Sequence, residues 1–415
     1  SAPGQGNLIS GNLRMGVDIS ADDTVVQGNL IGTDVTGQLD LGNGSAAGDA
    51  GVRVFAGADG NRIGGTASGA GNTIAFNNGE GVQISTGVGD DAVDNAILGN
   101  SIHDNDDLGI DLGGTGVSPN DGGDADTGPN DLQNFPLLAW AVTGSTGIAG
   151  TLNSESNTSY RIEFFSGPVA DGSGFGEGET FLGAATTTTG PGGDASFAAV
   201  FGQDVPNGHQ VTMTATELAL GGTPTNTSEF SQAAAVPTPC DVTGTSGKDV
   251  FQDTPGDQVY CGKGGGDVFV ADSGNDAFIG GSGNDTVRFS ATNGPVTVDL
   301  LKKTATGDGT GFLTGIERVV GSPQADILKG DGSRNVLKGG PGNDLLIGRG
   351  GRDLLVGQGG RDTERGGAGG DTLKGGAAND ALFGQGGDDA LNGGGGKKDR
   401  CRQGPGTGPI RKCEL

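Results

Sequence analysis

The sequence of 415 residues is poor in aromatic and other bulky side chains and in long apolar runs. It contains 16 Phe, 2 Tyr, 1 Trp and 2 Met, too few for a large core packed from helices. No apolar run approaches the roughly 20 residues that a membrane-spanning helix requires. The sequence therefore predicts no insertion into a membrane.

Basic residues are nearly absent from the first half of the chain. Residues 1–239 hold 28 acidic residues against four Arg and no Lys, a net charge of −24. Residues 240–415 are closer to balance, with 23 acidic and 20 basic residues. Because an acidic surface repels phosphate groups, we expect no nucleic-acid partner and no attachment to anionic lipid.

Cysteine is scarce, and its four positions lie at the two edges of the second half. Neither pair has the C-x-x-C spacing of a zinc or redox site. We predict two local disulfides, Cys240–Cys261 and Cys401–Cys413, while the other connectivities of four cysteines stay open. Disulfides indicate an oxidising compartment, so we expect a secreted, extracellular or cell-surface protein.

Glycine is abundant, with 89 residues, and each glycine inside a helix costs about 1 kcal/mol. Glycine without a collagen period indicates short strands joined by frequent tight turns. The predicted fold class is all-β.

Residues 1–112 contain imperfect repeats with spacings near 30 residues. One unit reads Gly-apolar-x-apolar, as in Gly51–Val54 and Gly81–Ile84, and another reads Asn-x-Ile, as in Asn72–Ile74. Short alternating strands with Asn and Gly turns indicate coils of a parallel β-helix. The repeats, with the phrase Ile63–Thr66, resemble the right-handed parallel β-helix family. Residues 1–9 match 66–74 without the preceding Ile-Gly-Gly, so we expect the natural protein to extend further N-terminally.

Two further segments follow. Residues 113–134 are rich in Gly, Asp, Asn and Pro and are predicted to form a linker. Residues 135–236 change to longer strands with turn signals, at 160–165, 195–201 and 210–216, which indicates an immunoglobulin-like β-sandwich. Within the linker, Asp121, Asp124, Asp126 and Asp131 partly match a calcium loop, although a solvated linker explains them as well.

From residue 249 an acidic or amide residue recurs every nine positions, and an apolar residue stands two positions after nearly every one. Glycine permits the tight turn, aspartate supplies a charged oxygen for calcium, and the apolar residue enters a narrow core. This pattern resembles the hemolysin-type (RTX) calcium-binding repeats, which form a parallel β-roll. Residues 240–415 are therefore expected to form a calcium-binding β-roll, with repeat blocks at 249–287 and 321–392 separated by the spacer 288–320.

In that family two nonapeptides form one turn, and each calcium ion lies between loops one turn apart. The resemblance implies that Asp267 shares an ion with the loop of Asp285, and Asp353 with that of Asp371. The neutral Asn335 is expected to bind weakly, and Lys398 in the next position is expected to end the series. The carboxylate and amide ligands expected are Asp267, Asp276, Asp285, Asp326, Asn335, Asp344, Asp353, Asp362, Asp371, Asp380 and Asp389. The loop glycines expected at the ions are Gly264, Gly266, Gly281, Gly283, Gly340, Gly342, Gly351, Gly360, Gly367, Gly369, Gly376 and Gly387.

The resulting functional prediction is a structural or adhesive calcium-binding protein. Alternate loops share a side of the roll, so Arg334, Arg349 and Arg352 are expected to form a positive patch for a polysaccharide or cell-surface glycan. The alternative is a carbohydrate-active enzyme of the β-helix class, with most of its catalytic coils outside this sequence. Its candidate residues are His103 and Asp104 with Asp106 and Asp107, or Asp90 with Asp91. Acid–base chemistry on uronates also needs a nearby cation, and residues 1–112 hold three Arg and no Lys, which makes the enzyme the weaker prediction.

Overall fold

The computed structural model describes residues 6–46, 48–85, 91–114, 116–142, 146–168, 172–307 and 309–414, and it is almost entirely β-structure. The chain divides into two compact units, residues 1–238 and 239–415. Within the described ranges, no helix combines the length and apolar character that crossing a bilayer would take. The all-β class predicted from glycine content is confirmed.

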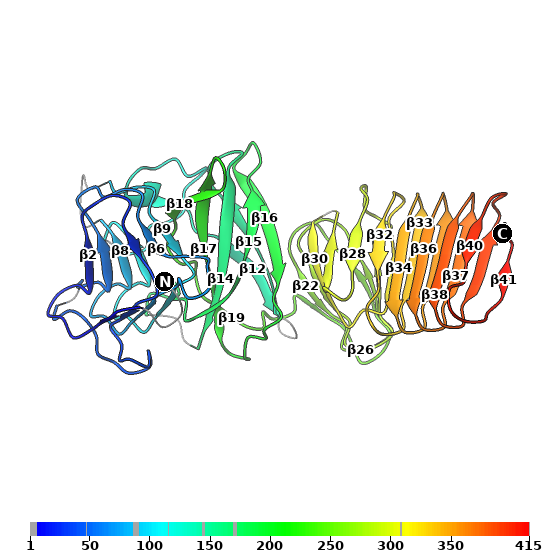
Figure 1. The fold of residues 1–415 in the computed structure, drawn as a ribbon, viewed down its shortest axis with the longest axis horizontal. Coiled ribbons are helices and arrows are strands. Elements are labelled where there is room, and N and C mark those ends of the chain that lie inside the picture. Colours follow the sequence, from blue (N-terminus) through cyan, green and yellow to red (C-terminus); the bar gives the residue numbers. More distant parts are fainter. Residues whose placement is uncertain are drawn as a thin grey trace. The chain divides into compact units, whose positions relative to one another are not determined.

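Residues 8–112 form the coils of a parallel β-helix with three sheets (Figure 1). The first sheet contains β1 (Leu8–Ile9), β4 (Leu30–Ile31), β7 (Thr73–Ala75) and β10 (Ser101–His103). The second contains β2 (Val17–Ile19), β5 (Val52–Val54), β8 (Val82–Ile84) and β11 (Ile110–Leu112). The third contains β3 (Val25–Val26), β6 (Arg62–Gly64) and β9 (Ala96–Leu98).

The two repeated sequence units each build one sheet. The Gly-apolar-x-apolar units stack in register, with Val52 beside Val82 and Val54 beside Ile84. The Asn-x-Ile units stack likewise, with Ile74 beside Ile102. Their aliphatic side chains are fully or nearly fully buried, so burial of apolar area drives the stacking of successive coils.

Asparagine ladders run along the turns of the β-helix. Asn29 Nδ2 donates to Asn72 Oδ1 (3.0 Å), and Asn72 Nδ2 donates to Asn100 Oδ1 (2.9 Å). A second ladder joins Asn12, Asn43, Asn77 and Asn105. These side chains satisfy backbone N–H and C=O groups that would otherwise be buried without partners.

The sandwich pairs two antiparallel sheets. One contains β12 (Leu137–Val142), β13 (Gly147–Asn153) and β16 (Asp194–Val200). The other contains β14 (Ser159–Gly167), β15 (Thr180–Thr188), β17 (Gln210–Ala219), β18 (Thr223–Thr227) and β19 (Ala234–Ala235). The core between them includes Tyr160, Ile162, Phe164 and Met213.

The sandwich and the segment before it are bound to the end of the β-helix. Asn130, in the 3-10 turn η1 (Pro129–Leu132), accepts from Asn95 N–H (3.0 Å) and so extends a third asparagine ladder. Glu163 accepts from Gly99 N–H and Glu229 from Leu112 N–H. Part of the segment predicted as a linker is thus hydrogen-bonded to the last coil.

Residues 239–415 form a two-sheet parallel roll. The long sheet runs through β20 (Val242–Thr243), β22 (Val259–Cys261), β25 (Ala277–Ile279), β30 (Thr310–Thr314), β29 (Thr304–Thr306), β28 (Thr297–Asp299), β32 (Ile327–Lys329), β34 (Leu345–Gly350), β36 (Thr363–Ala368), β38 (Ala381–Gly386) and β40 (Arg400–Arg402). The short sheet runs through β21 (Val250–Gln252), β24 (Val268–Val270), β27 (Thr286–Arg288), β31 (Arg318–Val320), β33 (Val336–Pro341), β35 (Leu354–Gly359), β37 (Thr372–Ala377), β39 (Ala390–Gly394) and β41 (Ile410–Arg411). A two-stranded ladder joins β23 (Gly264–Gly265) and β26 (Ser282–Gly283).

The spacer 288–320 joins the roll instead of leaving two separate blocks. Its strand β31 lies parallel between β27 and β33, so the short sheet is continuous. In the long sheet, β30, β29 and β28 form an antiparallel meander that fills the place between β25 and β32.

Most strands of the roll contribute one buried side chain to its core. Aromatic rings stack in the first turns, with Phe251 and Phe269 centroids 4.8 Å apart, and leucines follow from Leu328 to Leu391. Glu364 lies in the leucine column between Leu346 and Leu382 and is fully buried. Cys240–Cys261 and Cys401–Cys413 are both disulfide-bonded, as predicted, and Thr243 pairs with Cys261 one turn away.

Candidate calcium centre

Two rows of acidic residues run along the roll, each residue directly preceding a strand. The row beside the long sheet includes Asp326, Asp344, Asp362 and Asp380, and the row beside the short sheet includes Asp353, Asp371 and Asp389. In both rows, a carboxylate Oδ1 accepts the backbone N–H of the row residue one turn earlier. Asp371 Oδ1 accepts from Asp353 N–H at 2.8 Å, and Asp362 Oδ1 accepts from Asp344 N–H at 2.9 Å. The backbone therefore fixes each carboxylate in its row.

The second oxygen of nearly every row carboxylate is buried without a hydrogen-bond partner. These Oδ2 atoms belong to Asp267, Asp285, Asp344, Asp353, Asp362, Asp371, Asp380, Asp389 and Asp399. A buried oxygen without a partner costs about 1–3 kcal/mol, and rows of them are untenable without compensation. Bound calcium, which takes six to eight oxygen ligands, would supply that compensation.

A glycine five residues before most of the row aspartates makes room for the carboxylate. A Cβ at Gly357 would overlap Asp362 Oδ2 and the carbonyl oxygen of Gly375 one turn later. Gly348 stands in the same relation to Asp353 and Gly366. These glycines were not among the residues expected at the ions, although their constant spacing from most of the row aspartates is visible in the sequence.

Burial and neighbouring charge raise the pKa of several row carboxylates. Burial raises the pKa of Asp344 to about 7, and the carboxylates of Asp362 and Asp326 act in the same direction. Burial likewise raises the pKa of Asp353 and of Asp362 to about 6, with a smaller contribution from the next aspartate in the row. A divalent cation between successive carboxylates would reverse both effects, because it favours the charged form.

Three of the expected ligands differ from the rest. Both oxygens of Asp326 already accept protein hydrogen bonds, Oδ2 from Ser322 N–H and Oδ1 from Val296 N–H. Asn335 Oδ1 accepts from Asp331 N–H and its Nδ2 has no partner. Asp276 lies against Asp253, and burial raises its pKa to about 8.

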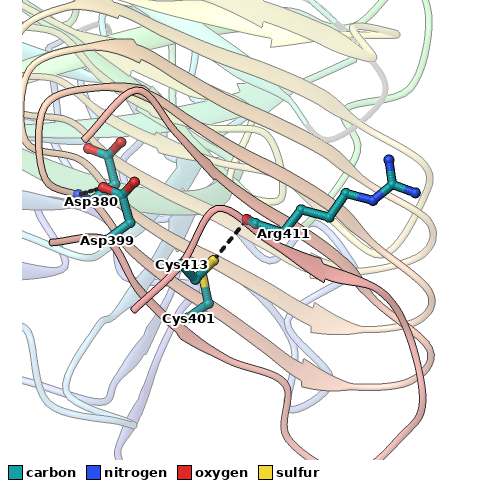
Figure 2. Close-up of a disulfide and its surroundings, with 5 residues drawn as sticks. All are labelled: Asp380, Asp399, Cys401, Arg411 and Cys413. Carbon is teal, nitrogen blue, oxygen red and sulfur yellow. Dashed lines mark hydrogen bonds between the residues drawn. A yellow bond between two sulfur atoms is a disulfide. The ribbon is translucent and has the colours of Figure 1, made fainter. Parts of the chain in front are cut away.

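Two members of the rows do not fit the nine-residue period of the sequence. Glu317 accepts from Asp285 N–H through Oε2 (2.8 Å), the bond that an aspartate makes elsewhere. Asp399 accepts from Asp380 N–H (2.9 Å), because one extra residue shifts the register from 18 to 19. Figure 2 shows the carboxylates of Asp380 and Asp399 side by side near the Cys401–Cys413 disulfide. The aspartate row thus continues past Lys398, where it was expected to end.

The loop glycines predicted at the ions mostly have a left-handed backbone. Gly340, Gly351 and Gly360 have φ of 122°, 100° and 117°, a region that disfavours side chains. Positive φ also occurs at Gly281, Gly283, Gly342, Gly367, Gly369, Gly376 and Gly387. Gly264 and Gly266 lack it, and Gly265 between them has a φ of 115°.

The three arginines expected to form one patch do not behave alike. Arg349 forms a bidentate ion pair with Asp299, at 2.6 and 2.7 Å, and also donates to Gly330 C=O. Arg334 and Arg352 are exposed. The sequence could not show that Asp299 of the spacer lies beside Arg349. Because Arg349 is paired with this carboxylate, only Arg334 and Arg352 remain as exposed cations of the predicted patch.

The other candidate residues lie in the first unit. The carboxylate oxygens of Asp121, Asp124 and Asp126 lie within 4.8 Å of one another. Asp131 instead accepts from Asn226 Nδ2. His103 Nδ1 contacts Asp104 at 2.8 Å, and Asp106 and Asp107 line a pocket of about 510 Å³. Asp91 is exposed, whereas its partner Asp90 falls outside the described residues.

Comparison with known families identifies the repeats. Four copies of the RTX calcium-binding nonapeptide repeat match residues 262–293, 313–345, 329–364 and 365–397. No curated protein matches the chain. The roll is therefore a calcium-binding RTX structure, as its sequence predicted, and calcium is its cofactor.

Proposed function

Because residues 262–397 carry RTX calcium-binding repeats, we propose that this chain is a secreted or cell-surface structural protein whose roll folds on calcium and serves adhesion. The observation that carries the proposal is the set of buried carboxylate oxygens without partners along both rows. Metal binding that satisfies such atoms contributes directly to folding.

We assign the calcium ions to the loops between successive row members. Asp344, Asp353, Asp362, Asp371 and Asp380 are the central ligands, since each presents one free buried oxygen. Asp267, Asp285, Asp389 and Asp399 extend the rows in the same geometry. Asp276, Asp326 and Asn335 bind more weakly, because neighbouring protein groups already occupy or crowd their oxygens.

Two features support an extracellular location. Extracellular calcium modules bind with dissociation constants of about 10⁻⁴–10⁻³ M, so the roll would fold outside the cell and stay open in the cytosol. The two disulfides are stable in oxidising compartments. The adhesive role follows from a rigid roll whose outer faces are formed by exposed side chains.

A calcium titration of the full chain tests calcium-dependent folding. Trp140, the single tryptophan, is buried in the sandwich, so its fluorescence reports the first unit only. We expect far-ultraviolet circular dichroism to gain β signal at about 10⁻⁴–10⁻³ M calcium, with Trp140 emission constant throughout. A complete β signal in EGTA would overturn the proposal.

A matched pair of variants tests the ligand assignment. Asp353→Asn removes one charged oxygen and should raise the calcium midpoint on the order of tenfold. Glu414→Gln removes the same charge from an exposed position in the same unit and should leave the midpoint unchanged. Equal midpoints in the two variants would argue against Asp353 as a ligand.

A further inference from the structure

A pocket of about 490 Å³ opens on the roll near its C-terminal end. It is lined by Arg365, Phe383, Gln385, Gly386, Arg402, Gly404 and Pro405. Two guanidinium groups and one aromatic ring therefore share a single concave surface, which we call the arginine pocket.

Strand register builds this pocket. Arg365 of β36 pairs with Phe383 of β38, and Phe383 pairs with Arg402 of β40. Their neighbours Glu364 and Leu382 are buried, so the alternation of a strand turns the three pocket side chains outward. Strands lie roughly 4.8 Å apart, which places the backbones of the two arginines about 10 Å apart on either side of the ring.

The surrounding face of the long sheet is cationic and apolar. Its outward positions on β32, β34, β36, β38 and β40 are Ile327, Lys329, Leu345, Ile347, Thr363, Arg365, Ala381, Phe383, Arg400 and Arg402. None of these described positions carries a carboxylate, although the whole chain has a net charge of −27. Two acidic residues border this set: Asp299 pairs in register with Lys329, and the exposed Glu414 forms a β-bridge with Arg400. Neither of them lines the pocket.

These groups match the chemistry of an anionic sugar. A guanidinium binds a carboxylate or sulfate through two parallel hydrogen bonds. A phenyl ring offers an apolar face to the C–H groups of a pyranose ring, and Gln385 adds a hydrogen-bonding amide. A polymer with one anionic group on each sugar can contact Arg365 and Arg402 while a ring between them stacks on Phe383.

We propose that the arginine pocket binds an acidic polysaccharide through a carboxylate- or sulfate-bearing sugar. The proposal goes beyond the calcium-folded roll, and it locates glycan contact at residues other than Arg334, Arg349 and Arg352. The repeated negative charge of such a polymer complements the two arginines of the pocket, whereas a neutral glycan leaves both arginines without a partner.

Isothermal titration of the calcium-loaded full chain with short oligosaccharides tests the pocket. The probes are tetragalacturonate, a sulfated tetrasaccharide and a neutral tetrasaccharide, all short enough to avoid calcium gels. The double variant Arg365→Gln/Arg402→Gln should weaken binding of an anionic probe by at least tenfold, and Phe383→Ala should weaken it severalfold. Lys338→Gln/Lys374→Gln is the matched control, because these exposed lysines hold the same strand position on the short sheet.

The two anionic probes distinguish the sources of charge. Preference for tetragalacturonate identifies a uronate ligand and preference for the sulfated probe identifies a sulfated one, and either result supports the proposal. No binding of either anionic probe, equal losses in the arginine and lysine variants, or equal binding of an oligonucleotide would overturn it. Circular dichroism with calcium on every variant separates this result from a failure of the roll to fold.

Discussion

Glycine recurs five residues before most row aspartates because the carboxylate occupies the space where a Cβ would stand. At Gly357 that space holds Asp362 Oδ2 and the carbonyl oxygen of Gly375. At Gly359 nothing lies closer than 4.0 Å, and the same place in the next repeats is held by Ala368 and Ala377. A side chain is therefore excluded at Gly357 and has room at Gly359, only two residues away.

We expect Gly357→Ala to destabilise the calcium-loaded roll by about 1–3 kcal/mol, because the methyl group displaces the carboxylate. Gly359→Ala should be neutral or should stabilise it by about 0.4–1 kcal/mol, since it only restricts the unfolded chain. Urea unfolding in saturating calcium, followed by circular dichroism, measures both. Similar losses in the two variants would show that the roll disfavours any methyl group in this loop.

The nine-residue period of the sequence does not identify every residue of the two rows. A period of nine finds every aspartate whose spacing is regular, because the ladder repeats at 18 residues. It misses Asp399, which one inserted residue moves, and Glu317, whose longer side chain reaches the same backbone N–H. A residue belongs to a row because of how its strand pairs with the strand one turn earlier, and not because of its spacing in the sequence.

At the scale of elements, the β-helix depends on hydrogen bonds between identical side chains. Asn72 accepts from the backbone and side chain of Asn29, and donates to Asn100 Oδ1 and to Val26 C=O. Asn12 stands exposed at the end of its own ladder and bonds Asn43 alone. In the interior of a ladder, several buried polar groups therefore depend on a single asparagine side chain for their hydrogen bonds.

Asn72→Ala should lower the unfolding free energy of the first unit by about 2–4 kcal/mol, because it leaves several buried groups without partners. Asn12→Ala should cost less than about 1 kcal/mol, since water can replace the lost partner. Urea unfolding in EGTA, monitored by Trp140 fluorescence, isolates this unit. A loss at Asn12 as large as that at Asn72 would contradict the dependence on burial.

Local repeats were the most predictable elements, since the same residues form the same strands in each coil. The Gly-apolar-x-apolar and Asn-x-Ile units gave two of the three β-helix sheets, and the predicted sandwich strands coincide with β14, β16 and β17. The ion pair between Arg349 and Asp299 joins residues 50 positions apart through the meander of the spacer. No periodic pattern encodes such a contact, so the sequence could not predict that Arg349 is ion-paired within the roll.

At the scale of the molecule, acidic groups tie the sandwich to the β-helix. Glu229 accepts from Leu112 N–H and Ser118 N–H, and burial raises its pKa to about 8, well above the 4.5 of a free glutamate. The folded unit therefore holds a proton that the unfolded chain releases. This contribution to stability is complete below about pH 4.5 and is lost as the pH rises through 8.

We expect the first unit to lose stability between pH 5 and 8, with Glu229 contributing up to about 1.4 kcal/mol per pH unit. Glu229→Gln should reduce this slope, and Glu155→Gln, at an exposed carboxyl, should leave it unchanged. Trp140-monitored urea unfolding at several pH values in EGTA measures the slope. A slope that persists fully in Glu229→Gln would assign the proton to another group.

The short-sheet row lacks aspartate at two successive positions, Glu317 and Asn335, while the long sheet carries its antiparallel meander at the same level. As calcium is withdrawn, the roll should therefore open first between residues 288 and 335 and break into two pieces there. A protease added at intermediate calcium would cut at this seam and release a C-terminal fragment of defined length. Weak ligands at one level thus give the roll a built-in breaking point.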